Sequence, residues 1–136
     1  MSPVLKAVDV STPCPCGDPR GYARCCGPLH DGAPATDAAM LMRSRYSAYV
    51  LKREDYLLAT WHPHTRPASL RLTAQPACTW LGLDVTRSAS DDADHASVEF
   101  VARYRAGGGR AQRLHELSRF VREHGRWYYL EGDIRS

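Results

Sequence analysis

Four cysteines stand close together near the N-terminus of the 136-residue chain, in the stretch CPCGDPRGYARCCG. A Cys-x-Cys pair begins the stretch, eight residues follow, and a Cys-Cys pair closes it, so the four thiols are Cys14, Cys16, Cys25 and Cys26. Two closely spaced thiolates can bind one side of a metal ion, and a second pair can complete a tetrahedron. We therefore predict a zinc site with four thiolate ligands. His30 could take the place of Cys26, and iron could replace zinc, because both ions accept this geometry.

Other uses of these cysteines agree less well with the sequence. The start of the chain, MSPVLKAVDVSTP, has no long apolar run and does not resemble a signal peptide. We therefore expect a cytoplasmic protein whose thiols stay reduced, and adjacent cysteines pair with each other only under strain. A thioredoxin-like site would need Cys-x-x-Cys near a βαβ pattern, which this sequence lacks.

Composition limits the class of protein. Hydrophobic residues make up 43% and charged residues 24% of the chain, as in ordinary globular domains. No stretch approaches the roughly 20 apolar residues of a membrane span. The net charge of +3 is spread along the chain, whereas nucleic-acid binding usually needs a dense basic stripe. We expect neither a membrane span nor nucleic-acid binding.

The first half of the chain indicates an arm, a turn-rich loop and two helices. Residues 1–13 are expected to form a short arm, and residues 14–34 are rich in Gly, Pro and Cys, which favours turns. Thr36 or Asp37 is a suitable N-cap for a helix that continues to about residue 50. A second helix is predicted for residues 53–61, because Pro63 prevents it from continuing.

The second half alternates like antiparallel strands. Strands are predicted over residues 78–87, 97–105, 112–123 and 126–134, with turns at 88–94 and 106–110. Segment 112–123 also fits a helix, but its position between two turns favours a strand. In the first strand, period two places Trp80 and Gly82 on the face opposite to Leu83. Helices followed by strands indicate an α+β fold in which helices cover one face of a curved antiparallel sheet.

The cysteine stretch also resembles a known motif. CPCGDPRGYARCCG resembles the SEC-C motif, a metal-binding module of the preprotein-translocase ATPase, with Tyr22 at its aromatic position. Asp18 and Pro19 replace the usual Ser-Gly of that motif, and its basic residues are reduced to Arg20 and Arg24.

The wider chain, including CCGPLHDG, AAMLMRSRYSAYVL, DYLLATWHP and RWYYLEGD, resembles the bacterial YchJ family. The resemblance implies an N-terminal arm with a SEC-C metal knuckle (residues 1–34) and a cystatin-like α+β cone of the nuclear-transport-factor-two type (residues 35–136). It implies no biochemical activity. We expect the hydrophobic core of the cone to be separate from the knuckle.

Two functions remain open at this point. In the first, the knuckle is a metal-stabilised module that presents Arg20, Tyr22 and Arg24 to a protein or ribosomal partner. In the second, the cone binds a small molecule or acts as an enzyme, with a pocket formed by Arg43, Tyr46, Tyr49, Trp61, His62 and Glu116. An enzyme is the less favoured reading, because no nucleophile and base stand in a catalytic pattern.

Glu116 has two possible roles. Beside apolar neighbours its pKa could be raised, which would suit a general base. It could instead form an ion pair with Arg43 or Arg45 that fixes the first helix to the sheet, and we favour the ion pair.

Overall fold

A computed structural model describes residues 12–72 and 78–135, so most of the predicted arm lies outside the described residues. The helical elements come first along the chain: η1 (Tyr22–Arg24), α2 (Cys26–His30), α3 (Ala38–Val50) and α4 (Glu54–Ala59). Four strands follow: β1 (Cys78–Asp92), β2 (His95–Ala106), β3 (Ala111–Glu123) and β4 (Arg126–Ile134).

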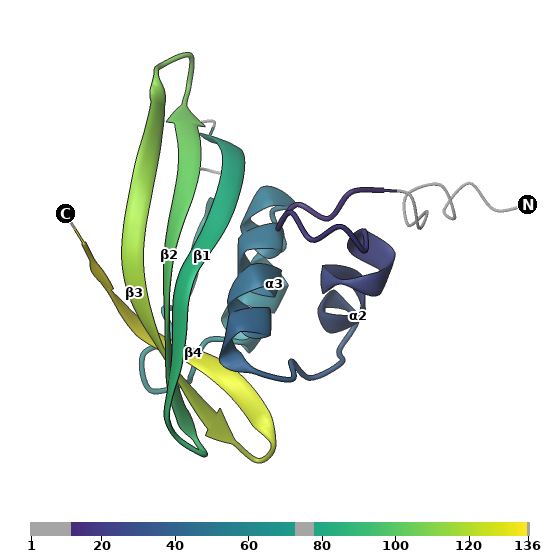
Figure 1. Cartoon of the computed structure of the whole chain (residues 1–136), viewed down its shortest axis with the longest axis vertical. Coiled ribbons are helices and arrows are strands. Elements are labelled where there is room, and N and C mark those ends of the chain that lie inside the picture. Colours follow the sequence, from purple (N-terminus) through teal and green to yellow (C-terminus); the bar gives the residue numbers. More distant parts are fainter. Residues whose placement is uncertain (1–11, 73–77, 136) are drawn as a thin grey trace, which may run out of the picture.

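The four strands form one antiparallel sheet in the order β1-β2-β3-β4, so each strand pairs with its neighbours in the sequence. Helix α3 lies against one face of this sheet, and α2 lies on the far side of α3 (Figure 1). The predicted α+β class is confirmed, and so is the assignment of segment 112–123 to a strand. No helix within the described ranges has the length and apolar character needed to cross a bilayer.

Helix α3 is the element that connects the cysteine loop to the sheet. Asp37 begins it as predicted, since its side chain accepts a hydrogen bond from the backbone N–H of Met40 at 2.7 Å. Helix α4 follows after a short turn in which Lys52 has a positive φ of 58°. It ends at Ala59, two residues before the predicted end.

Strand β1 differs from its prediction in two ways. It continues to Asp92, because Ala89 and Ser90 pair with Ser97 and Ala96 of β2, so the predicted turn at 88–94 is wrong for most of its length. An irregularity in the pairing at Leu81 also changes which side chains face inward.

Leu81 is 40% exposed, and Trp80 packs on the buried cluster together with Leu83. The predicted separation of Trp80 and Leu83 onto opposite faces is therefore wrong, because one extra residue in a strand shifts the alternation. Gly82 leaves room for the Arg103 side chain, since a Cβ there would overlap the guanidinium.

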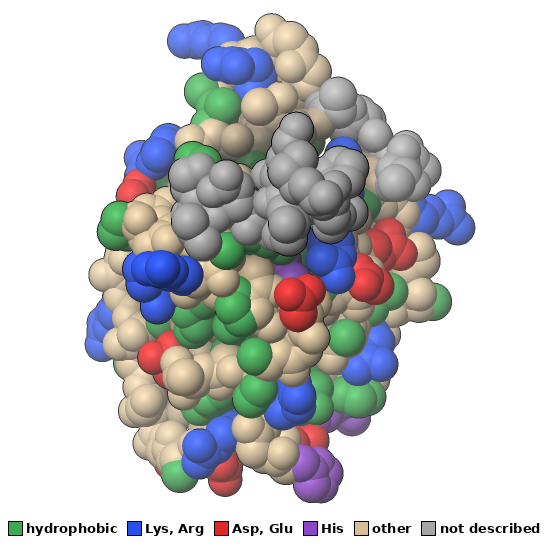
Figure 2. Space-filling view, turned by 90° about the vertical axis from the view of Figure 1, so that its right-hand side faces the viewer, with side chains coloured by type: hydrophobic (Ala, Val, Ile, Leu, Met, Phe, Trp, Pro, Cys, Tyr) green, Lys and Arg blue, Asp and Glu red, His purple; other side chains and the backbone are tan. Residues whose placement is uncertain are grey.

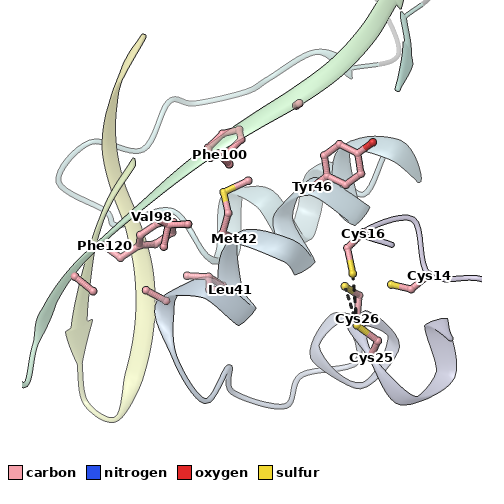
Figure 3. Packing of buried hydrophobic residues seen from close by; sticks show 13 residues of the cluster. Cys14, Cys16, Cys25, Cys26, Leu41, Met42, Tyr46, Val98, Phe100 and Phe120 are labelled. Atoms are coloured by element: carbon pink, nitrogen blue, oxygen red, sulfur yellow. Dashed lines mark hydrogen bonds between the residues drawn. The ribbon is translucent and has the colours of Figure 1, made fainter. Parts of the chain in front are cut away.

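The hydrophobic core has two sides. On one side of α3, Leu41 and Met42 point toward Val98, Phe100 and Phe120 of the sheet (Figure 3). On the other side, the four cysteines of the N-terminal loop are buried in the same cluster. The structure does not have the separate cores that we expected, because α3 contributes side chains to both sides. The division of the chain at residue 34 stays a prediction.

Candidate metal centre and cone cavity

The cysteine loop is built from one tight turn and two short helices. Gly17 donates its N–H to the carbonyl of Cys14 at 2.9 Å and has a φ of 92°, a conformation that favours glycine. Residues 22–30 form η1 and α2, where only turns were predicted. These helical turns place Cys25 and Cys26 beside the Cys14–Cys16 segment.

The four Sγ atoms form a compact cluster, which we call the metal centre: Cys14, Cys16, Cys25 and Cys26. All four lie within 4.8 Å of one another, and each residue is at most 4% exposed. The Cys16–Cys25 and Cys25–Cys26 Sγ distances are 3.6 and 3.8 Å. Four sulfurs at ~2.3 Å from a central zinc would be ~3.8 Å apart in a tetrahedron. The donor set therefore fits a tetrahedral metal ion (Figure 3).

Two neighbouring side chains direct hydrogen bonds at these sulfurs. Ser47 of α3 donates its hydroxyl to Cys26 Sγ at 3.2 Å, and its oxygen lies 3.6 Å from Cys14 Sγ. Arg20 places a guanidinium nitrogen 3.9 Å from Cys25 Sγ. Such bonds from outside the ligand set orient the thiolates and offset their negative charge.

The close packing of the four thiols shifts their acidities in opposite directions. The pKa of Cys14 is held far below its usual range by hydrogen bonds from Cys16 and Cys26. Burial, with Cys16 as the next cause, raises the pKa of Cys25 to about 12, and hydrogen bonding with Cys14 raises the pKa of Cys26. Without an ion the cluster stabilises one thiolate at the cost of others, whereas a divalent ion would attract all four as thiolates.

His30 is occupied by other contacts. Its Nε2 lies 2.8 Å from the carbonyl of Ser44, so this nitrogen must carry the proton and donate it. Its Nδ1 then accepts from the hydroxyl of Tyr22 at 2.7 Å. Burial lowers the pKa of His30, which keeps the ring neutral. Of the two candidates for the fourth ligand, the geometry brings Cys26 into the metal centre, while both nitrogens of His30 are used elsewhere.

The expected partner-binding residues of the knuckle lie in different environments. Arg20 and Arg24 are exposed, and Arg20 forms an ion pair with Asp18 at 3.0 Å. Tyr22 is half-buried and points its hydroxyl inward to His30. Figure 2 views the side of the molecule on which α2 lies, where basic and acidic side chains are interspersed.

A second site lies on the opposite side of α3, between this helix and the sheet. It is a cavity of about 240 Å³, which we call the cone cavity. Its wall consists of Met42, Arg45, Tyr46, Tyr49, Trp61, Trp80, Phe100, Ala102, Leu114, Glu116, Ser118 and Tyr129. Tyr46, Tyr49, Trp61 and Glu116 thus share the cavity, as the sequence predicted for a pocket.

Two residues expected in this pocket lie elsewhere. Arg43 is not part of the cavity wall, and Arg45 takes its place. His62 Nε2 donates a hydrogen bond to the carboxylate of Glu123 at 3.0 Å, and its ring packs on Tyr128.

Arg45 is the most buried charged residue of the cavity, with 4% exposure. Its Nη1 donates to the carbonyl of Leu57 and to the hydroxyl of Thr60, both at 2.7 Å. Its guanidinium carbon lies 5.1 Å from the ring centroid of Trp61 and 4.6 Å from that of Tyr129. These bonds direct Arg45 toward α4, and burial lowers its pKa.

The expected ion pair of Glu116 with Arg43 or Arg45 is not among the ion pairs of the described residues. Glu116 Oε2 instead accepts the hydroxyl of Ser118 at 2.7 Å. Gly132 of β4 leaves room for the Glu116 carboxylate, because a Cβ at this position would overlap it. The interaction is missing because Arg45 reaches the end of α4 rather than strand β3.

Sequence reasoning missed Arg45, Trp80 and Tyr129 as cavity residues. The signal for Arg45 was present, since Met42, Arg45, Tyr46 and Tyr49 follow the three-and-four spacing of one helix face. Trp80 was assigned to the wrong face because of the irregularity at Leu81.

Comparison with known proteins agrees with this architecture. The model of the family described as "YchJ, middle NTF2-like domain" matches residues 37–132. A UPF0225 protein of Xanthomonas campestris is 61% identical over 119 residues, which covers 88% of this chain and 92% of the relative. A UPF0225 protein of Bordetella pertussis is 60% identical over 125 residues, 90% of this chain and 92% of the relative.

Two solved structures are similar over nearly the whole chain. A SEC-C motif containing protein from Rhodopseudomonas palustris is 36% identical with a TM-score of 0.76, and the match covers 92% of this chain and all of that one. A SEC-C motif containing protein from Psychrobacter arcticus is 31% identical with a TM-score of 0.75, over 93% and 85% of the two chains. The cysteine cluster and these SEC-C relatives indicate a metal-binding site. The chain belongs to the YchJ family.

Proposed function

We propose that this chain is a cytoplasmic zinc protein in which one ion, bound by Cys14, Cys16, Cys25 and Cys26, fixes the N-terminal loop on α3. The observation that carries the proposal is the pair of Sγ distances of 3.6 and 3.8 Å, which match the edges of a zinc tetrathiolate. Soft thiolate ligands in a tetrahedron select zinc or iron over hard cations such as magnesium.

The role of the ion is structural. Four protein ligands complete its coordination and leave no position for water or substrate, which is the pattern of structural zinc sites. The burial of all four cysteines agrees with this role, since substrates could not reach the ion.

Metal analysis of protein produced without added zinc tests the proposal. We expect one zinc per chain, no visible absorption and loss of the metal in Cys16→Ser. Cys78→Ser is the matched control, because Cys78 is exposed and lies outside the metal centre, and it should retain the metal. If the protein contained iron and showed the visible absorption of an iron thiolate, the bound ion would be iron and not zinc. Wild-type protein without any metal, or equal metal in both variants, would contradict it.

We also infer that the knuckle binds a protein or ribosomal partner through Arg20 and Arg24. The supporting observation is that both arginines are exposed beside the metal centre, whereas the hydroxyl of Tyr22 is bound to His30. Tyr22 therefore belongs to the internal structure of the knuckle. This surface depends on the ion, because Arg20 lies 3.9 Å from the ligand Cys25.

A pull-down from the native cytosol tests this interaction. The double variant Arg20→Glu/Arg24→Glu should retain its zinc and lose the partner, and a chelator should also release the partner from the wild-type chain. An exposed pair far from the knuckle, Arg105→Glu/Arg110→Glu, serves as the control for changed net charge. Identical capture by all variants would rule out the knuckle as the binding surface.

A further inference from the structure

The cone cavity contains a positive charge that forms no ion pair, although Glu116 of the same wall attracts it from a greater distance. Arg45 is 4% exposed, and no carboxylate of the described residues lies within the 4 Å ion-pair distance of its guanidinium. The two hydrogen bonds that Nη1 donates are directed at neutral acceptors, the carbonyl of Leu57 in α4 and the hydroxyl of Thr60 directly after this helix. A buried charge without an ion pair is unfavourable, so an anion that entered the cavity would gain strongly from Arg45.

A residue of the same cavity wall has an unused hydrogen-bond donor. Trp61 Nε1 is buried and is the one side-chain polar atom of this kind without a partner among the described residues. Buried indole N–H groups normally have an acceptor, so this orphan indicates that one is supplied by something else. The Trp61 ring packs at 4.9 Å on Tyr129 and lies 5.1 Å from the guanidinium carbon of Arg45, so the Trp61 and Arg45 side chains are neighbours in the cavity wall.

Apart from Glu116 and Ser118, the remainder of the wall is apolar or aromatic. Trp80, Ala102 and Leu114 come from the β1–β2–β3 side of the cavity, away from α4. Tyr46 and Tyr49 pack on the Trp80 ring at 5.7 and 6.0 Å. This end can bind a flat apolar group, while the Arg45 end can bind its acidic group.

Size limits the ligand further. The volume of about 240 Å³ is far larger than the roughly 10–15 Å³ that one water needs, so the cavity has room for a small organic molecule. The Glu116 carboxylate is held by Ser118 and occupies the space beside Gly132. Tyr129 contacts both charges, since its hydroxyl lies 3.5 Å from Glu116 Oε2 and its ring 4.6 Å from the guanidinium carbon of Arg45. A ligand carboxylate would be repelled by Glu116 and attracted by Arg45, so it would bind on the Arg45 side of Tyr129.

We propose that the cone cavity binds a small carboxylic acid with an aromatic or apolar body, whose carboxylate accepts hydrogen bonds from Arg45 and from Trp61 Nε1. The planar guanidinium can donate two parallel hydrogen bonds to such a carboxylate, a geometry that lysine does not offer. The site lies on the other side of α3 from the metal centre, and its ligand chemistry is independent of the identity of the ion.

Titration of the full-length, metal-loaded chain with benzoate, followed by the NMR signals of the three indole N–H groups, tests the proposal. The Trp61 signal should move downfield on binding. The Trp127 signal should remain in place, because Trp127 is outside the wall of the cone cavity. Benzamide has the same shape without the charge and should bind at least about tenfold more weakly.

Substitutions separate the proposed contacts from unspecific binding. Trp61→Phe keeps the aromatic wall, removes the donor and should weaken benzoate binding about tenfold, whereas Trp127→Phe should leave it unchanged. Leu114→Trp should abolish binding by filling the apolar end. Glu116→Gln should leave benzoate binding equal or tighter, because it removes a negative charge from the wall.

Three results would overturn the proposal. The first is a Trp61 signal that does not respond to benzoate in the millimolar range. The second is equal affinity for benzamide and benzoate. The third is equal loss of binding in Trp61→Phe and Trp127→Phe. The same spectra establish that each variant is folded, so a failure to bind cannot be confused with unfolding.

Discussion

The hydroxyl of Ser47 lies 3.2 Å from Cys26 Sγ, so a residue of α3 donates a hydrogen bond to the metal centre. Ser47 is fully buried, and the opposite side of the same helix forms the wall of the cone cavity. Helix α3 therefore contacts both candidate sites of the molecule.

Ser47→Ala should weaken metal binding without removing a ligand. A buried hydrogen bond to a thiolate is worth about 1.5–3 kcal/mol, and loss of such outer contacts typically costs about 10–100-fold in metal affinity. Competition with a zinc chelator measures this change. Ser44→Ala is the control on the same helix, because its hydroxyl bonds to Leu41 and Tyr56 and to no thiol. Equal affinity of both variants for zinc would show that Ser47 does not assist the ion.

Removal of the metal should loosen the sheet side of the core as well as the cysteine loop. The cysteines share one buried cluster with Leu41, Val98 and Phe120, and binding of a structural zinc contributes about 10 kcal/mol or more in small domains. We expect faster hydrogen exchange in α3 and β2 after chelation, and a lower melting temperature. If exchange increased only within residues 12–34, the knuckle and the cone would be independent units.

Gly27→Ala should destabilise the chain through Tyr22. A Cβ on Gly27 would lie 2.7 Å from the carbonyl oxygen of Tyr22 and 3.2 Å from its ring, so Tyr22 must move. That carbonyl accepts the N–H of Cys25 at 3.1 Å, and the shift would disturb a metal ligand. We expect a loss of about 1–3 kcal/mol in the free energy of unfolding. Gly108→Ala meets nothing within 4 Å and should be nearly neutral. Equal stability of the two variants in chemical denaturation would contradict the clash.

His30 should make the folded state sensitive to mild acid. Burial lowers its pKa in the folded chain, so below the ordinary value of 6.5 the unfolded chain binds the proton first. As far as His30 is concerned, the free energy of unfolding should therefore have its highest value above pH 6.5. It should decrease as the pH falls below 6.5, with a slope of at most about 1.4 kcal/mol per pH unit.

Denaturant unfolding of zinc-loaded wild type and His30→Gln at several pH values isolates this effect, because acid release of zinc is common to both proteins. Glutamine can keep a donor toward the carbonyl of Ser44 but does not titrate. The two curves should diverge below pH 6.5, with the wild type losing more stability. Parallel curves would mean that His30 is protonated equally in the folded and unfolded chains.

The parts of the structure that follow from local chemistry could be predicted from the sequence. Close spacing of thiols identified the metal centre, the side chain of Asp37 identified the start of α3, and alternation identified four strands. The position of Leu81 could not be predicted in this way. Period two holds only while the pairing is regular, and the irregularity at this residue is a property of how β1 pairs with β2.

The residues of the cone cavity were predicted in part, and Arg43 was predicted in the position that Arg45 occupies. A residue turns the helix by about 100°, so Arg43 lies away from the face shared by Met42, Arg45, Tyr46 and Tyr49. Sequence patterns favour arginine in solvent, and only the packing of α4 and β4 around Arg45 explains its burial. The helix α2 was also missed, because Gly27 and Pro28 are typical of turns in isolation.

The uneven pairing of β1 has a consequence for how copies of the chain meet. Strand β1 is an edge strand of the sheet, and its pairing with β2 is irregular at three places, near Leu81, Thr86 and Asp91. Such irregularities bend the edge strand and interrupt the even row of N–H and C=O groups to which a strand of another copy would have to pair. A regular edge strand of fifteen residues would favour the addition of further strands and the growth of fibrils, and the irregular pairing of β1 opposes this.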